Sequence, residues 1–343
     1  MASSRNSEEM DNDFNLFQEP EDYYPPKPED KVEVFDRNPE LVTAGTPSQI
    51  TVNLLGAHPL WGHYLWNAAK VFANYLDERK HIVQGKSVLE LGAAGALPSL
   101  VSACNGASRV VITDYPDHDL VENIRRNVKA NVPANKIAEG LVTVEGFKWG
   151  YDIEKIAELS TQNGAFDVLI LSDLVFNHSE HSALLRSVDR LMAKPQKDGS
   201  GGGEAYVFFT HHRPWLVDKD MDFLTRAHNE LGLTVTRLVE DYTGAMFDSD
   251  PGDERVRGTV HGFYVENANN GDGFLVFAET MLTPLVEAID FVKRTDIGGN
   301  VYIFVGTSEE RVKIMIDAGG EEYEAVFKDI VEMGNAFILK NHS

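Results

Sequence analysis

The stretch SVLELGAAGALPSL, residues 87–100, decides the fold of this chain. It begins with an apolar run typical of a buried strand, and it ends with an apolar pattern typical of a helix. Between these two parts, from Gly92 to Ala96, the chain has only glycine and alanine. A strand that turns through small residues into a helix lets the backbone approach a ligand closely. Residues 87–100 therefore predict the first strand–helix unit of an α/β sheet, with a candidate ligand site at the turn.

Apolar runs and helical patterns alternate from Gly85 to residue 266. The runs are SVLELG, RVVITDY, LVTVEGF, FDVLILSDLVF, AYVFFTHH, LTVTRLVED and VHGFYV. Helices are predicted after Gly95, after Asp117, and around residues 153–159, 181–192 and 221–231. The alternation indicates a doubly wound, Rossmann-like α/β fold with seven strands. The last two strands follow each other without a helix, so we expect them to pair as an antiparallel hairpin.

Shorter elements precede this sheet. Residues 1–30 are acidic and contain several prolines, a composition typical of a disordered arm. The runs VEVFDR and ITVNLLG predict a small strand pair. Apolar residues at spacings of three and four, from Leu65 to Leu76, predict an amphipathic helix. We therefore expect one domain over residues 31–266.

The last part of the chain, residues 267–343, has a different pattern. It opens with NANNGDG, which predicts a linker. Strands are predicted at residues 274–278 and 300–306, and helices at residues 284–294 and 323–338. We expect a small α/β C-terminal extension without a catalytic group, whose role the sequence does not indicate.

Composition excludes several classes of protein. The 343 residues are 43% hydrophobic, enough for a packed core, and contain no apolar run long enough to span a membrane. The net charge of −23 disfavours binding to nucleic acid and favours a basic protein partner, although acidity also serves solubility alone. The single cysteine, Cys104, excludes an internal disulfide. No secretory signal is visible, so we expect a cytoplasmic monomer.

The turn differs from the dinucleotide-binding pattern G-x-G-x-x-G. That pattern needs a glycine where the backbone meets a pyrophosphate. Here Ala93 and Ala94 stand between Gly92 and Gly95. An alanine Cβ crowds a pyrophosphate but leaves room for a nucleoside or an amino acid.

Two acidic residues accompany the turn. Glu90 lies in an apolar strand, and a buried carboxylate needs a partner, such as an ammonium group or a backbone N–H. Asp114 ends the second strand, 22 residues after Gly92, where an acid can accept hydrogen bonds from both ribose hydroxyls. Nicotinamide enzymes share this arrangement. The residues alone therefore leave a dinucleotide, a phosphate, S-adenosylmethionine and no ligand as alternatives.

A set of motifs resembles a known family. HPLWGHYLWNAA, VLELGAAGALPSL, TDYPD, FKWG and LILSDLVFNHSEH are similar to sequences of the class I, seven-stranded S-adenosylmethionine-dependent methyltransferases. Within that class they resemble protein methyltransferase family sixteen, over roughly residues 12–266. The resemblance implies S-adenosylmethionine as cofactor and protein amines as substrate. More narrowly, it implies the N-terminal glycine and adjacent lysine of translation elongation factor 1-alpha, a basic partner suited to the acidic chain.

The same resemblance implies a cofactor pocket. In it Trp66 covers the cofactor, Asp114 binds the ribose hydroxyls, Trp149 stacks near the adenine, and Ser172 closes the pocket. The methionine and ribose side is lined by Gly92, Ala93 and Ala94. Large aromatic rings suit a purine. Two alternatives stay open for the first of these residues: Trp66 is a core residue of the amphipathic helix, or Trp61 takes its place.

The resemblance implies two catalytic residues in the fourth strand, Asp173 and Phe176 of the motif DLVF. A carboxylate favours the charged form of a nearby amine, so Asp173 suits capture and orientation of an ammonium group better than its deprotonation. Phe176 adds a cation–π contact. The alternative for Asp173 is that it caps the following helix.

Histidines accompany both ends of the predicted site. His211 and His212 end the fifth strand, where a histidine can relay a proton, although ordinary loop histidines are an equal alternative. His178 and His181 stand three residues apart, but no third ligand is evident, so we predict no metal site.

Three functions stay open at this stage. The first is an enzyme that methylates protein amines. The second is a small-molecule, nicotinamide-type N-methyltransferase. The third is an NAD-dependent oxidoreductase or a binding module without catalysis.

Overall fold

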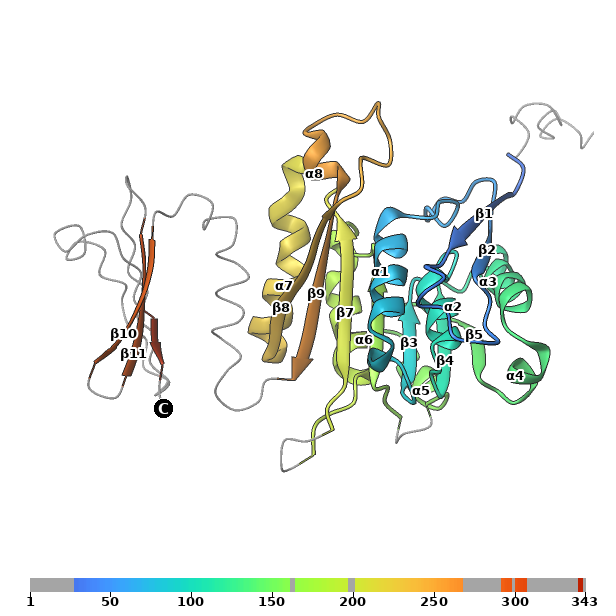
Figure 1. Cartoon of the computed structure of the whole chain (residues 1–343), viewed down its shortest axis with the longest axis horizontal. Coiled ribbons are helices and arrows are strands. Elements are labelled where there is room, and N and C mark those ends of the chain that lie inside the picture. Colours follow the sequence, from blue (N-terminus) through green and yellow to red (C-terminus); the bar gives the residue numbers. More distant parts are fainter. Residues whose placement is uncertain are drawn as a thin grey trace, which may run out of the picture.

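A seven-stranded sheet forms the centre of the molecule (Figure 1). The structure is a computed structural model that describes residues 28–160, 164–196, 201–267, 291–297, 300–306 and 339–341. The strand order is β5-β4-β3-β6-β7-β9-β8. The strands are β3 (Ser87–Leu91), β4 (Arg109–Asp114), β5 (Val142–Gly146), β6 (Val168–Ser172), β7 (Glu204–Thr210), β8 (Leu233–Tyr242) and β9 (Thr259–Asn267).

The pairing confirms the predicted topology. Strands β3 to β7 run parallel, and β9 joins β7 antiparallel. Strands β8 and β9 pair antiparallel, with a register shift between Arg237 and Val239. The predicted doubly wound sheet with an antiparallel terminal hairpin is therefore correct.

Helices cover both faces of the sheet (Figure 1). The α-helices are α1 (Asn67–Glu78), α2 (Leu97–Cys104), α3 (His118–Asn131), α4 (Ala134–Ala138), α5 (Ile153–Ala157), α6 (His181–Leu191), α7 (Val217–Leu231) and α8 (Glu254–Gly258). Short 3₁₀ turns are η2 (Lys80–Ile82), η3 (His178–Glu180) and η4 (Pro214–Leu216). None of the helices in the described ranges is long and apolar enough to cross a membrane.

The side chains of the sheet divide into two cores. Val88 and Val168 belong to the core under α1, α2 and α3, whereas Leu89 and Leu169 belong to the core under α5, α6 and α7. Neighbouring residues of a strand point to opposite faces, so a strand covered on both faces is apolar throughout. This explains why a central strand such as β6 appears in the sequence as a continuous apolar run.

The first helix begins later than its apolar pattern. Helix α1 starts at Asn67, and Trp66 occupies the N-cap position with an extended backbone (φ −64°, ψ 146°). Leu65 precedes the helix and is buried in the core beside it. The apolar spacing identified the buried face correctly but not the point where helical hydrogen bonding starts.

The predicted strand pair before the helix is confirmed. Strands β1 (Lys31–Asp36) and β2 (Gln49–Leu54) pair antiparallel. The predicted arm lies outside the described residues, apart from its last three.

The C-terminal extension contains a small antiparallel sheet. Its strands are β10 (Phe291–Ile297), β11 (Asn300–Gly306) and β12 (Leu339–Asn341), in the order β10-β11-β12. The predicted strand at residues 300–306 is confirmed. The helix predicted at residues 284–294 is wrong where it is described, because residues 291–294 belong to β10. A Gly-Gly pair separates the paired residues Ile297 and Asn300, and this spacing favours a hairpin. The other elements predicted there, at residues 274–278 and 323–338, lie outside the described residues.

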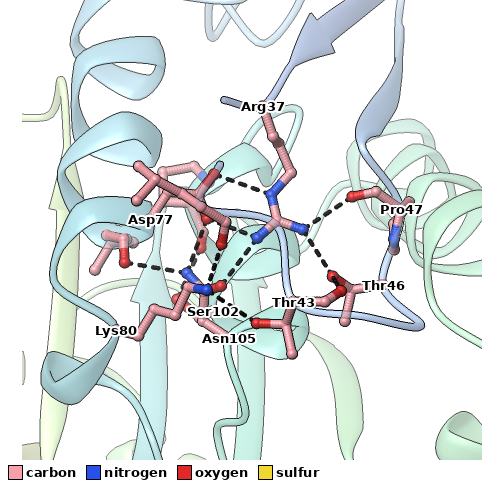
Figure 2. A network of polar contacts seen from close by, with 11 residues as sticks. Arg37, Thr43, Thr46, Pro47, Asp77, Lys80, Ser102 and Asn105 are labelled. Atoms are coloured by element: carbon pink, nitrogen blue, oxygen red, sulfur yellow. Dashed lines mark hydrogen bonds and ion pairs between the residues drawn. The ribbon is translucent and has the colours of Figure 1, made fainter. Parts of the chain in front are cut away.

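A buried arginine ties the β1–β2 hairpin to the helices (Figure 2). The guanidinium of Arg37 donates to both carboxylate oxygens of Asp77 in α1, at 2.9 and 2.7 Å. It also donates to Asn105 at 2.9 Å and to Thr46 at 3.2 Å, and to the carbonyl of Pro47 at 2.9 Å. Both charged side chains are buried, so this clamp satisfies them only while all its members stay in place.

Removing one side of this clamp should destabilise the protein strongly. We expect Arg37→Ala or Asp77→Ala to lower the free energy of unfolding by about 3–5 kcal/mol, because each leaves a buried charge uncompensated. Urea unfolding followed by circular dichroism measures this. The control is the exposed pair Glu33–Lys70 (3.2 Å), which also joins β1 to α1. Lys70→Met should cost less than about 1 kcal/mol. If both pairs gave an equal loss in the free energy of unfolding, burial would not be the reason for the effect of the Arg37–Asp77 pair.

Candidate functional site

One cavity of about 750 Å³ opens at the carboxyl ends of β3, β4, β5 and β6. Parallel strands present their carboxyl ends at one edge, so residues distant in sequence meet there. Every predicted site residue lines this cavity: Trp66, Gly92, Ala93, Ala94, Asp114, Trp149, Ser172, Asp173 and Phe176. The structure thus brings them together around one space, and the role of each stays a prediction.

The turn between β3 and α2 has a strained backbone. Gly92, Ala94 and Ala96 have φ values of 62°, 46° and 62°. Only glycine adopts this left-handed region without cost, so two alanines stand where the backbone favours glycine. Strain of this kind persists where the surroundings hold it, and it is concentrated at functional sites.

Gly95 serves packing rather than a special φ. A Cβ at Gly95 would lie 2.7 Å from Cγ1 of Val52 in β2. The carbonyl of Gly95 accepts a hydrogen bond from Asn127 of α3 (3.1 Å), whose amide also pairs with Asn53 of β2. The β1–β2 hairpin therefore packs directly against the turn between β3 and α2.

Asp114 holds the same turn from the next strand. Its Oδ2 accepts a hydrogen bond from the N–H of Ala94 at 2.7 Å, and its Oδ1 accepts one from Tyr115 at 2.7 Å. The residue is 8% exposed. Burial raises the pKa of Asp114, and the two N–H groups oppose that shift. Each oxygen keeps a second lone pair for a ligand.

Glu90 has the backbone partner that its burial demands, but only on one oxygen. Its Oε2 accepts from the N–H of Ser99 in the first turn of α2, at 3.2 Å. Its Oε1 has no hydrogen-bond partner among the described residues. Burial raises the pKa of Glu90 to about 8, so the group is largely neutral at pH 7 until a cation pairs with it.

The cavity wall therefore carries three buried carboxyl groups. Glu90, Asp114 and Asp173 are 1%, 8% and 4% exposed. Burying an ionised carboxylate is costly without a counter-charge. A cationic ligand relieves that cost, whereas a pyrophosphate adds to it. The wall favours a positively charged ligand.

Aromatic rings complete the cavity. Trp149 follows β5, and Trp66 caps α1 and contacts the ring of Phe247 edge-on at 6.1 Å between centroids. The interpretation of Trp66 as a core residue of the helix is wrong, because it precedes the helix and is partly exposed to the cavity. Trp61, 51% exposed, lines the cavity as well, so the choice between the two tryptophans stays open.

Asp173 has a constrained and unusual environment. Its φ is 58°, and its N–H donates to the carbonyl of Phe208 in β7 at 2.7 Å. Its Oδ1 bonds to Nε2 of His212 at 2.9 Å and accepts from the N–H of Thr210 at 3.3 Å. Its Oδ2 is buried and has no partner among the described residues. No side chain caps η3 or α6, so the alternative of Asp173 as a helix cap is wrong.

Sequence reasoning missed a further buried carboxylate, which does not line the cavity but binds two histidines near Asp173. Asp220 of α7, almost fully buried, bonds to Nε2 of His178 at 2.6 Å and to Nδ1 of His211 at 2.7 Å. The ring of His181 bonds to the carbonyl of Val175 at 2.7 Å. These contacts fix residues 173–181 against β7 and α7. The signal in the sequence was the set of histidines. Asp220, the partner that His178 and His211 share, lies 42 residues from His178.

Comparison with known proteins identifies the family. A family model described as "Lysine methyltransferase" matches residues 56–227. The protein N-terminal and lysine N-methyltransferase EFM7 of Schizosaccharomyces pombe is 43% identical over 74% of this chain and 96% of its own length. The proteins of the same name from Cryptococcus neoformans and Yarrowia lipolytica are 38% and 39% identical, over 79% and 72% of this chain and 95% and 94% of their own lengths.

The chain belongs to this lysine methyltransferase family. It is a methyltransferase, and S-adenosylmethionine is its methyl donor. The oxidoreductase and the silent binding module are thereby set aside. The methyltransferase cavity suits this donor, because Oε1 of Glu90 is buried and has no hydrogen-bond partner in the described part of the chain, and the donor carries an ammonium group and a sulfonium.

The methyltransferase turn allows a matched test at two glycines. Gly92 and Gly232 have nearly equal φ values, 62° and 64°, but only Gly92 is enclosed: a Cβ there would lie 2.7 Å from Leu174 and 3.0 Å from Trp149. We expect Gly232→Ala to lower the free energy of unfolding by about 1 kcal/mol from backbone strain. Gly92→Ala should cost about 1–3 kcal/mol more from overlap. Urea unfolding of both variants measures the difference, and equal losses would contradict the enclosure of Gly92.

Proposed function

We propose that this methyltransferase modifies protein amines, namely an N-terminal glycine and an adjacent lysine, and that its substrate is translation elongation factor 1-alpha. The carrying observation is the cavity wall of three buried carboxyl groups, of which Asp173 keeps a buried oxygen without a partner among the described residues. Two cations meet in such a reaction, the donor and the incoming ammonium. The three buried carboxyl groups lie near the ends of different strands, so separate acids can stabilise the donor and the incoming ammonium.

On the donor side, we assign the roles by position along the wall. When bound, S-adenosylmethionine supplies an electrophilic methyl group on its sulfonium. Asp114 accepts hydrogen bonds from the ribose hydroxyls with its remaining lone pairs, and Trp149 stacks near the adenine. Trp66 covers the site, and Ser172 closes it. The methionine and ribose side is lined by Gly92, Ala93 and Ala94.

On the substrate side, Asp173 orients the amine. Its Oδ2 accepts a hydrogen bond from the incoming ammonium, and the ring of Phe176 adds a cation–π contact. The nitrogen must be neutral to attack, and an α-amino group loses its proton more readily than a lysine, with ordinary pKa values of about 7.7–8.0 and 10.4. The residues then contribute alignment and exclusion of water rather than acid–base chemistry.

Two observations support a protein substrate. The relatives are named protein N-terminal and lysine N-methyltransferases, and they are matched over nearly their whole length. The net charge of −23 favours encounter with a basic protein and disfavours nucleic acid. We further propose that residues 31–266 form the catalytic unit, a cytoplasmic monomer flanked by the acidic arm of residues 1–30 and the extension of residues 267–343.

Donor binding should depend on Asp114. We expect Asp114→Ala to abolish binding of S-adenosylmethionine in isothermal titration calorimetry, because the ribose hydroxyls lose their acceptor and Ala94 loses its hydrogen bond. Asp114→Asn keeps the shape without the charge, and we expect it to weaken binding about 10- to 100-fold. Asp222→Asn, an exposed acid on α7, serves as control and should bind as the wild type does. Unchanged binding by Asp114→Ala would overturn this assignment.

The substrate is tested with a labelled donor. Purified elongation factor 1-alpha should gain methyl groups at its N-terminal glycine and adjacent lysine, seen by intact mass and by spectra of the N-terminal peptide. Chemical acetylation of the N-terminus should remove the first label, because the amide nitrogen is no longer a nucleophile. Nicotinamide is the competing substrate in a parallel reaction. Label on nicotinamide alone would replace this proposal by the small-molecule alternative.

A further inference from the structure

His212 contacts three residues that line the cavity. Its Nε2 bonds to Oδ1 of Asp173 at 2.9 Å. Its ring lies edge-on to Trp66, with 4.9 Å between centroids, and edge-on to Phe176, with 6.2 Å between centroids. His212 itself does not line the cavity, so it acts on the substrate only through these neighbours. The adjacent His211 bonds instead to Asp220, so the two histidines have separate carboxylate partners.

We propose that His212 is a positioning residue for methyl transfer: it holds Asp173 so that the free Oδ2 faces the amine, and its positive charge offsets the carboxylate so that the bound amine can lose its proton. The inference rests on the proposed function. It assigns to His212 a role that differs from proton relay, since the proton of the ammonium leaves to solvent.

The geometry supports the first half of this role. Two donors, the ring of His212 and the N–H of Thr210, both bond to Oδ1 of Asp173. Oδ2 is left buried and without a partner among the described residues. A carboxylate held by one oxygen in this way cannot rotate freely, and its other oxygen keeps one direction. Asp173 also has a left-handed backbone (φ 58°), which fixes the base of the side chain.

Electrostatics supports the second half. An isolated carboxylate stabilises an ammonium group and raises its pKa, which opposes the loss of the proton that attack requires. A positive charge on the far side of the same carboxylate reduces this effect. Burial disfavours the charged form of His212, but Asp173 and Asp220 outweigh burial, and the pKa of His212 is raised; Arg213 opposes the rise. His212 is therefore charged below its raised pKa and loses the charge as the pH rises through it.

The test is the pH dependence of kcat for an N-terminal peptide substrate, at saturating peptide and donor, because kcat reports the pKa of the amine in the bound complex. In His212→Gln the amide still donates to Asp173, but the charge is gone. We expect the rising limb of the profile to move to higher pH by about 1 unit, with kcat reduced near pH 7 and recovered at high pH. His211→Gln is the matched control and should leave the limb in place. A limb that stays in place in His212→Gln would overturn the proposal, because it would show that a neutral donor suffices.

A second measurement does not require turnover. Histidine ring signals in NMR give the titration of His212 in the protein without substrate. Asp173→Asn should lower the pKa of His212, because the carboxylate that stabilises the charged ring is gone. In the kinetic assay, which does require turnover, His212→Gln in the Asp173→Asn background should cause no further shift of the limb, because the histidine acts through Asp173. An unchanged titration would overturn the proposal. A wild-type protein that binds the donor but methylates no peptide amine would instead contradict the proposed function.

Discussion

The structure depends on the left-handed turn between β3 and α2. At Ala94 and Ala96 the main chain takes a conformation that alanine disfavours, so the surroundings must hold it. They do so from three sides: Asp114 accepts a hydrogen bond from the N–H of Ala94, Asn127 donates one to the carbonyl of Gly95, and β2 packs closely on the Cα of Gly95, where a Cβ would overlap it. The Arg37 clamp in turn fixes the hairpin that contains β2. Distant parts of the chain thus determine the shape of five residues.

The same arrangement gathers buried carboxyl groups at one edge of the sheet. Glu90, Asp114 and Asp173 each end or interrupt an apolar strand region. Among the described residues, one oxygen of Glu90 and one oxygen of Asp173 have no hydrogen-bond partner, and each oxygen of Asp114 has a single backbone partner. In a purely structural core this would be a liability. Around a cavity that, as we propose, receives a sulfonium and an amine, the same groups stabilise the incoming positive charges. The backbone N–H groups and His212 keep the acids oriented until those cations arrive.

Much of this fold could be predicted from the sequence, and part of the site as well. Seven apolar runs with intervening helices predict a doubly wound sheet with an antiparallel terminal hairpin, and parallel strands gather Gly92, Asp114 and Asp173 at one edge. Long-range polar pairs could not be predicted, because Arg37 and Asp77, or His178 and Asp220, have no local signal for their pairing. Nor could the left-handed alanines, since local preference argues against them and only tertiary contacts impose them. Residues 291–294 of β10 were assigned to a helix because Leu285, Ile289 and Val292 stand at helical spacing.

The alanines at positions 94 and 96 have a thermodynamic consequence. A glycine-rich turn samples many conformations when empty and must give up that freedom when a ligand arrives. Here Cβ atoms and the surrounding hydrogen bonds restrict the turn beforehand, so folding rather than ligand association bears the entropic loss. Less of the free energy of contact with the ligand is then spent on ordering the turn. The strain stored in the backbone is a form of preorganisation.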